Sequence, residues 1–254
     1  MVVIVESWVE ATRHVRSMVR NSELLVFAAL QPIMFVLLFV YILGGSIAVE
    51  GFPRYQQYLI PGILAQGVVF STSFTSVGLA EDLTRGFVDR LRSLPIRPAS
   101  ILIGRTISDA IRNAGVLVVT IAVAFVVGFR FEGSLADAFL ATMLLLAFSY
   151  AMSWIQVWIA LSVKTAEAAN SAGVMWMFPL TFVSSAYVDP ATMPAWMQPL
   201  AEHNPFTALT NAIRALYNGH DPGGDWWLAL LWAAVIGTVF AALGAGRFAR
   251  ATRR

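Results

Sequence analysis

Cysteine is absent from this chain of 254 residues, and lysine occurs only once, at Lys164. Without cysteine the chain has no disulfide, no thiolate metal site and no cysteine nucleophile. A nucleotide-hydrolysing P-loop ends in Gly-Lys followed by serine or threonine, whereas Lys164 follows Val163. The sequence therefore excludes a standard P-loop ATPase.

Other enzyme motifs are missing as well. The three histidines, His14, His203 and His220, lie far apart, and carboxylates do not cluster around them, so no metal site is expected. Serine hydrolase chemistry needs a serine, a histidine and a carboxylate within reach of one another, and no Gly-x-Ser-x-Gly elbow occurs. We predict that the chain is not an enzyme and has no catalytic residue.

Charged residues are scarce. Only 13% of the residues are charged while 58% are hydrophobic, and the mean hydropathy is +0.70. Soluble domains average roughly 25% charged and 45–50% apolar residues, so this composition indicates a membrane protein. The net charge is only +2, and the arginines lie at the ends of apolar runs. We therefore expect no nucleic-acid partner.

The apolar runs predict an all-α membrane protein with six transmembrane helices in one membrane domain, residues 1–254. Each run approaches the roughly 20 residues needed to cross ~30 Å of hydrocarbon. The predicted spans are 24–43, 58–79, 107–129, 138–163, 168–188 and 226–246.

Basic residues assign the topology. Fourteen arginines and lysines fall on the side of the two termini, against three on the other side. Because basic residues accumulate on the cytoplasmic side, both termini are expected in the cytoplasm, with the chain crossing the membrane several times.

The segment before the first span, residues 1–23, has an apolar helical face that includes Trp8. Two interpretations stay open. One is an interfacial helix lying on the bilayer, and the other is a helix packed on the cytosolic side of the protein itself.

The predicted outer segment, 189–225, contains two short amphipathic patterns. Asn204-Pro205 is a helix start, with asparagine as the cap and proline in the first helical position. Apolar residues then repeat at spacings of three and four, and Asn218-Gly219 ends the pattern. A second apolar face comprises Met193, Trp196, Met197 and Leu200. We expect two short helices that dip into the outer leaflet or cover the mouth of the domain.

The most charged stretch is 81–105, which holds five of the sixteen arginines. Within it Phe87, Leu91 and Leu94 share one helical face, and Pro95 and Pro98 are predicted to end that helix. The segment 80–98 is therefore expected to form a short amphipathic helix on a basic loop. It acts either as a topology signal alone or as a docking element for a cytosolic partner.

Neutral polar residues lie within the predicted spans, while ionisable residues at mid-depth were not found. Asp109 and Arg112 were placed near the cytoplasmic end of the third span, so an ion-coupled secondary transporter is disfavoured. The polar residues either pack helices together or line a path for an amphipathic substrate. The candidates for such a path are Gln31, Gln66, Ser71, Ser73 and Thr75.

These features together resemble the permease subunit of type-2 ABC exporters, especially the daunorubicin-resistance-like branch, over essentially the whole chain. The resemblance rests on the six-span length, on Asp89-Arg90-Leu91-Arg92-Ser93-Leu94-Pro95-Ile96 followed by Leu102-x-Gly104-Arg105, and on Asn204-Pro205-Phe206 with Arg214 downstream. Where family members often have threonine and glutamate, this chain has Phe87 and Asp89.

The resemblance implies a coupling helix that docks a separate cytosolic ABC ATPase, which would bind the ATP and magnesium; this chain would bind no cofactor. It further implies a dimer of two identical or related permease chains with two ATPase subunits. The residues expected to couple to the ATPase are Glu81, Asp82, Arg85, Gly86, Asp89, Arg90, Leu91, Arg92, Leu94 and Pro95. Asn204, Pro205, Phe206 and Arg214 would belong to an outer re-entrant helix.

The expected function is ATP-driven export of a hydrophobic or amphipathic substrate, such as a drug or a lipid-like molecule. The alternatives are a polysaccharide or glycolipid exporter of the same family, an ion-coupled secondary transporter, and a membrane enzyme or scaffold. Neither the substrate, nor the direction of movement, nor homodimer against heterodimer follows from the sequence.

Overall fold

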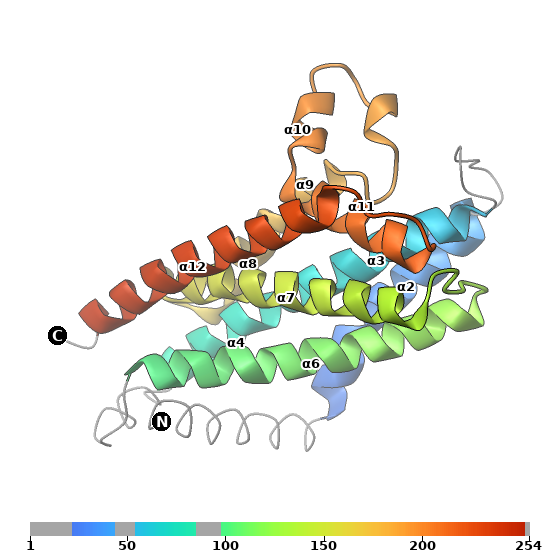
Figure 1. Cartoon of the computed structure of the whole chain (residues 1–254). Coiled ribbons are helices and arrows are strands. Elements are labelled where there is room, and N and C mark those ends of the chain that lie inside the picture. The colour runs from blue at the N-terminus through green and yellow to red at the C-terminus, as the bar shows by residue number, and fades with distance from the viewer. Residues whose placement is uncertain (1–21, 44–53, 85–97, 252–254) are drawn as a thin grey trace.

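The computed structural model describes residues 22–43, 54–84 and 98–251, and these residues form helices without any strand (Figure 1). The helices are α2 (Ser22–Leu43), α3 (Tyr55–Ser71), α4 (Ser73–Thr84), α6 (Pro98–Val126), α7 (Leu135–Ala160), α8 (Ala166–Met175), α9 (Met177–Phe182), the 3₁₀ turn η1 (Pro190–Thr192), α10 (Gln198–Glu202), α11 (Pro205–Tyr217) and α12 (Asp225–Ala251).

Four helical stretches of the described part are long and apolar enough to cross a membrane. They are Tyr55–Thr84, Leu102–Val126, Leu135–Ala160 and Asp225–Phe248, and they correspond to the predicted second, third, fourth and sixth spans. In α2 the shorter stretch Leu30–Ile42 is apolar. The all-helical membrane class is therefore confirmed with four candidate spans.

Helix α7 lies at the centre of the bundle and packs against α12, α4, α11 and α6. Its start is fixed by a capping box, in which Ser134 and Asp137 each accept from the other's backbone amide. Small residues of α12 permit close approach: a Cβ on Gly237 would lie 3.5 Å from the Cβ of Ala151. Close packing of small residues is a main source of helix association in lipid.

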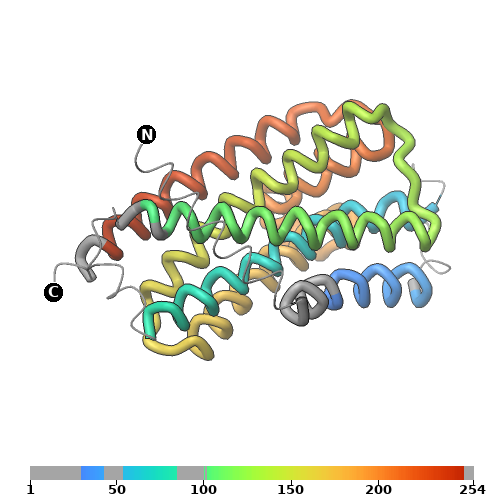
Figure 2. The backbone as a smooth tube through the Cα atoms, turned by 90° about the horizontal axis from the view of Figure 1, so that it is seen from below, coloured from blue at the N-terminus to red at the C-terminus, as the bar shows by residue number. Residues whose placement is uncertain are grey.

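Helix α2 lies at the edge of the bundle beside α3 and α6, as the view from below shows (Figure 2). Pro32 of α2 packs onto Gly67 of α3, where a Cβ would lie only 2.7 Å from the proline ring. Large apolar side chains on the rest of α2 stay exposed, including Met34 and Tyr41. This surface suits contact with lipid or with another chain.

The continuous fifth span predicted for 168–188 is wrong as a single helix. The chain instead forms α8 and α9, which are interrupted at Trp176, and leaves helical geometry after Phe182. Pro179 explains the interruption, because it has no amide to donate to the carbonyl one turn earlier. Neither helix alone reaches the length of a span.

Helix α6 begins at Pro98, earlier than the third span predicted from residue 107. Proline is well suited to this position, since the first amides of a helix have no intrahelical partner. The predicted interfacial helix, apart from residues 22 and 23, and residues 85–97 of the predicted amphipathic loop helix lie outside the described residues.

Two short helices, α10 and α11, occur in 189–225, but α10 covers only Gln198–Glu202 and contains only Leu200 of the apolar face predicted for the first of them. Figure 1 shows α10 projecting from the bundle, with Trp196 and Leu200 exposed nearby. Helix α11 differs from the expectation of a surface element: Phe206 and Ile213 are fully buried, and the helix packs against α12, α7 and α3. It is an integral part of the bundle.

Asn204 connects α11 to the broken helix. Its side-chain oxygen accepts from the Phe206 amide at 2.8 Å, as predicted for a cap. Its side-chain nitrogen donates to the carbonyl groups of Leu180 at 2.8 Å and Val183 at 2.6 Å. These carbonyls lie at the end of α9, where intrahelical donors run out. One asparagine therefore begins α11 and completes the end of α9.

Arg214 makes a second connection from α11. Its Nε donates to the Tyr58 carbonyl of α3 at 2.8 Å, and one Nη donates to the Ser185 carbonyl at 2.6 Å. The guanidinium also lies 3.7 Å from the centre of the Tyr58 ring. Burial lowers the pKa of Arg214 to about 10, which still leaves it a cation at neutral pH.

Pro61 creates the need for a further donor in α3. Because Pro61 has no amide, the Gln57 carbonyl lacks its intrahelical partner. Asn218, at the end of α11, donates to this carbonyl at 3.1 Å. The next residue, Gly62, lets the chain approach closely: a Cβ there would lie 2.2 Å from the Ala186 carbonyl oxygen. Helix α11 thus supplies the donors that a proline-containing α3 requires.

Replacing Arg214 with alanine is expected to destabilise the fold, because the carbonyl groups of Tyr58 and Ser185 each lose a charged donor, even though the Tyr58 hydroxyl still donates to the Ser185 carbonyl. We expect a fall in melting temperature of roughly 5–10 °C for the purified chain in detergent. Arg130→Ala is the matched control, since the exposed Arg130 also donates to carbonyl groups, those of Phe125 and Phe129. Equal melting temperatures for the two variants would contradict the structural role of Arg214.

Candidate functional site

The helix formed by α3 and α4 is interrupted at Thr72, in the middle of the hydroxyl cluster. The hydroxyl groups of Ser71, Thr72 and Ser73 each donate to the backbone carbonyl three residues earlier. Such side-chain bonds compete with the helical pattern. The Thr75 amide donates to the Thr72 carbonyl at 2.9 Å, so the Ser71 carbonyl is available to another element.

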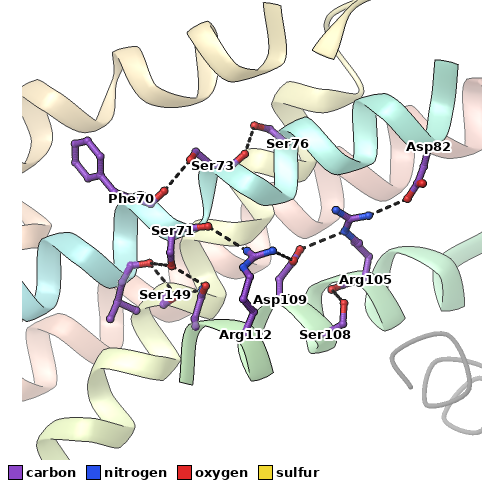
Figure 3. A network of polar contacts seen from close by, with 12 residues as sticks. Phe70, Ser71, Ser73, Ser76, Asp82, Arg105, Ser108, Asp109, Arg112 and Ser149 are labelled. Atoms are coloured by element: carbon purple, nitrogen blue, oxygen red, sulfur yellow. Dashed lines mark hydrogen bonds and ion pairs between the residues drawn. The ribbon is translucent and has the colours of Figure 1, made fainter. Parts of the chain in front are cut away.

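That element is α6, through Arg112. One Nη of Arg112 donates to the Ser71 carbonyl at 3.1 Å, and the other donates to Asp109 at 2.5 Å (Figure 3). The guanidinium also lies 5.4 Å from the centre of the Phe74 ring. Arg112 is only 7% exposed. A buried cation therefore completes the end of α3 at the break.

The charges continue from Arg112 towards the end of α4. Asp109, on α6, lies 3.5 Å from the Nε of Arg105, and Arg105 pairs with Asp82 on α4 at 2.8 Å (Figure 3). The exposed fraction of the side chain rises along this path, from 2% at Asp109 to 12% at Arg105 and 27% at Asp82. We call the chain of Asp82, Arg105, Asp109 and Arg112 the ion-pair network.

Gly78 gives Arg105 its position. A Cβ at Gly78 would lie 1.9 Å from a guanidinium nitrogen of Arg105. The guanidinium therefore lies against the backbone of α4, where any larger residue would displace it.

A neutral branch leads from the same break to α7. The Ser71 hydroxyl and the Asn113 side-chain oxygen lie 2.6 Å apart, and the Asn113 amide donates to the Ser149 hydroxyl, also at 2.6 Å. The break in α3, the middle of α6 and the centre of α7 are thereby joined through buried polar contacts. Such contacts are directional, so a shift of one helix displaces its partners.

The network begins where the predicted coupling segment begins. Glu81 and Asp82 form the last turn of α4, and Asp82 is a member of the network. The remaining predicted coupling residues lie outside the described residues; they are Arg85, Gly86, Asp89, Arg90, Leu91, Arg92, Leu94 and Pro95. Their docking role stays a prediction.

Sequence reasoning missed most of this network. The sequence marks Arg105 as a basic topology signal and as part of the Leu102-x-Gly104-Arg105 motif, and it places Asp109 and Arg112 near the cytoplasmic end of the third span. The structure buries Asp109 and Arg112 and brings them to the α3 break. The spacing of four and then three residues from Arg105 to Asp109 to Arg112 was the available signal, because it places all three on one helical face.

The residues predicted to line a substrate path divide into two groups. Gln31 is exposed on α2, at a shallow groove shared with Met34 and Leu38. Gln66, Ser71, Ser73 and Thr75 are buried. The two serines donate to backbone carbonyls within their own helix. A role for these residues in contacting substrate stays a prediction.

Aromatic rings form a continuous chain near Gln66. Successive ring centres lie 5.0 to 5.9 Å apart in the order Phe35, Phe39, Tyr187, Phe182, Phe178 and Phe70. The Tyr187 hydroxyl donates to the Gln66 side-chain oxygen. Phe178 and Phe182 are 46% and 44% exposed, so the chain of rings reaches the surface between α2 and α9. We call this the aromatic face.

No group of three histidine, cysteine or acidic side chains among the described residues could hold a metal ion. The site's chemistry is thus that of charge pairs, carbonyl groups and rings.

Comparison with known proteins gives a consistent picture. Residues 6–218 match the ABC-2 type transporter family. The daunorubicin resistance ABC transporter permease protein DrrB1 of Streptomyces coeruleorubidus is 32% identical over 219 residues, covering 86% of this chain and 77% of that protein. The probable doxorubicin resistance ABC transporter permease protein DrrC of Mycobacterium tuberculosis is 24% identical over 239 residues, covering 94% of this chain and 86% of that protein.

The family match covers most of the chain, and the first relative is similar over most of its own length. Both relatives are permease subunits, which are not themselves enzymes. The apolar helices described above agree with a multi-pass membrane protein. The chain therefore belongs to the ABC-2 type transporter family, as one of its permeases.

Proposed function

We propose that this chain is the transmembrane subunit of an ATP-driven exporter that moves a drug or lipid-like amphipathic substrate out across the bacterial cytoplasmic membrane. Both termini would lie in the cytoplasm, with six membrane crossings and with α10 and α11 forming an outer re-entrant segment. The observation that carries the proposal is the ion-pair network, because it joins the base of the predicted coupling segment to a break inside a candidate span.

The energy source would be a separate cytosolic ATPase. The chain has no P-loop sequence, and permeases of this family work with an ATPase partner. In this proposal two ATPase subunits, which bind the ATP and magnesium, dock on the coupling segments of two permease chains. ATP would close the ATPase pair and favour one of two permease conformations, because the coupling segment contacts the ATPase differently in each.

The ion-pair network would provide a physical route from the displaced coupling segment to the membrane helices. A displaced coupling segment would move Asp82, which pairs with Arg105, and the buried charges would carry the shift to Arg112 and the Ser71 carbonyl. Unpaired charges are costly in a low-dielectric interior. Helices α4 and α6 are therefore expected to move together, so that a displacement of α4 is transmitted to α6.

The aromatic face supports an aromatic, amphipathic substrate. Planar rings stack favourably at the 5–6 Å spacings found there. Beside it, the Gln66 side-chain nitrogen has no protein acceptor among the described residues and could bond to a polar group of the substrate. The relatives' names refer to daunorubicin and doxorubicin resistance. Polysaccharide export has no comparable feature in its favour.

An ion-coupled carrier has less support. Such a carrier needs a buried group that gains and loses a proton or an ion. Asp109 is the candidate, yet it lies between the guanidinium groups of Arg105 and Arg112. Both guanidinium groups pair with this carboxylate, so Asp109 is already engaged as an ion-pair partner within the bundle.

Leu91→Asp is expected to abolish co-purification of the ATPase while leaving the chain inserted in the membrane. The change places a charge on the apolar face that would enter the ATPase. Ser93→Asp is the matched control, because it adds the same charge to the same segment but on another helical face. Retention of the ATPase by Leu91→Asp, or its equal loss in both variants, would argue against docking through this face.

Asp82→Asn is expected to leave ATPase binding intact and to lower the substrate transported per ATP several-fold in proteoliposomes. The change removes the outermost charge pair, which is partly exposed, so little stability is lost. Asp109→Asn should behave differently and destabilise the fold by roughly 3–5 kcal/mol, since it leaves the buried Arg112 without its acid, whereas Arg105 keeps Asp82.

Glu167→Gln serves as the control for both variants, because Glu167 is an exposed acid outside the network. Normal transport per ATP in Asp82→Asn would exclude the network as a route of coupling, even if docking itself were confirmed.

Phe182→Leu is expected to weaken efflux of planar aromatic substrates several-fold, because it interrupts the aromatic face at an exposed ring. Efflux of an aliphatic amphiphile should change less. Phe139→Leu is the control, since Phe139 is an equally large exposed ring on α7, away from this face. Equal effects on the two substrates would contradict a role of the aromatic face in recognising planar aromatic substrates.

A further inference from the structure

Two adjoining hollows at the junction of α11 and α12 have no part in the function proposed above. The first is an apolar cavity of about 440 Å³ between α7, α11 and α12. Every side chain that lines it is apolar, among them Leu140, Met143 and Ala147 of α7, Leu216 of α11, and Trp226 and Leu230 of α12. A cavity with such a lining accepts hydrocarbon and offers no hydrogen bond to a polar ligand.

The second hollow is a polar pocket of about 320 Å³ that shares Pro222 with the first. Its charged lining comprises Arg214, Asp221 and Asp225. Asp225 lines the polar pocket, and the next residue, Trp226, lines the apolar cavity. The two hollows are therefore adjacent. Together they form one amphipathic site.

The charges of the pocket favour a cation. Arg214 is almost fully buried, and its guanidinium donates to the carbonyl groups of Tyr58 and Ser185. Asp221 and His220 are exposed and Asp225 is half-buried, so two carboxylates lie near the opening together with one imidazole. Two carboxylates exceed the single enclosed cation, and a ligand with an ammonium group would be attracted.

The position of the tryptophans agrees with a lipid as the ligand. Trp226 and Trp227 begin α12, and Trp227 is 63% exposed. Tryptophan is enriched at the level of lipid head groups. The acidic pocket therefore lies at head-group level, while the apolar cavity extends from there along α7 for roughly 10 Å between Leu140 and Ala147. Leu140 and Met143 are 54% and 40% exposed, so the cavity opens sideways towards acyl chains.

We propose that these two hollows form a binding site for a membrane phospholipid with a primary ammonium head group, such as phosphatidylethanolamine. The ammonium group pairs with Asp221 and Asp225, and an acyl chain fills the cavity between α7 and α12. The bound lipid would fill the space where the first turns of α12 separate from α7. This inference requires neither the ATPase nor any transported substrate.

Native mass spectrometry of the full-length chain, supplied with phosphatidylethanolamine or phosphatidylglycerol, tests the site. The wild type is expected to retain phosphatidylethanolamine in roughly tenfold preference. Ala147→Trp fills the cavity and should abolish the retained lipid. Leu231→Trp is the matched control, because Leu231 is a 59% exposed neighbour of Leu230 on α12 that does not line the cavity. Equal retention in Ala147→Trp and wild type would overturn the proposal.

A second variant tests the head group without altering the cavity. Asp221→Asn combined with Asp225→Asn keeps the size of both side chains and should bring the preference for phosphatidylethanolamine to about one. A preference that persists in this double variant would also overturn the proposal, whether or not Ala147→Trp folds. Because neither measurement uses ATP, a negative result here leaves the exporter function untouched, and failure of transport leaves the lipid site untouched.

Discussion

A helix that is interrupted inside a bilayer leaves carbonyl groups without water to bind, and these groups must find donors within the protein. Helix α3 poses this problem twice. Pro61 removes the partner of the Gln57 carbonyl near its start, and the break at Thr72 leaves the Ser71 carbonyl at its end. Asn218 donates to the Gln57 carbonyl, and Arg112 donates to the Ser71 carbonyl. Helices α6 and α11 pack against α3 and bring these donors to it.

The donors come from different parts of the chain, so α3 is bonded to elements that lead towards both ends of the molecule. Arg112 belongs to α6 and continues into the ion-pair network towards α4. Arg214 and Asn218 belong to α11, which also holds the end of α9 through Asn204. A change at either end therefore alters the bonding of the same helix. In the proposed exporter, that shared helix would relate the cytoplasmic coupling segment to the opposite face.

The sequence predicted those features that depend on local pattern. Apolar length located four of the candidate spans, and Asn204-Pro205 located the start of α11, because capping is decided within a few residues. The sequence did not predict the features that depend on contacts between residues far apart in the chain. The polar character of Ser71 and Asn113 could not show that they contact each other, and the hydropathy of 168–188 concealed the effect of Pro179 on a single helix. Burial of Arg112 follows from packing between α4, α6 and α7, which no local spacing encodes.

Arg214 also shows why one of the motifs that carry the family resemblance, Asn204-Pro205-Phe206 with an arginine downstream, has its particular chemistry. Arginine presents several donors in a fixed plane, so one side chain can bond carbonyl groups from two separate segments. Arg214 does so with Tyr58 and Ser185. Lysine has a single ammonium group on a flexible stem and cannot hold that geometry as rigidly. The near-absence of lysine from this chain is therefore compatible with a fold whose interior cations bind backbone, although coding bias acts on the same residue. In such a fold the interior charges serve first to hold broken helices together, and in the proposed exporter coupling between the two ends would be a consequence of that bonding.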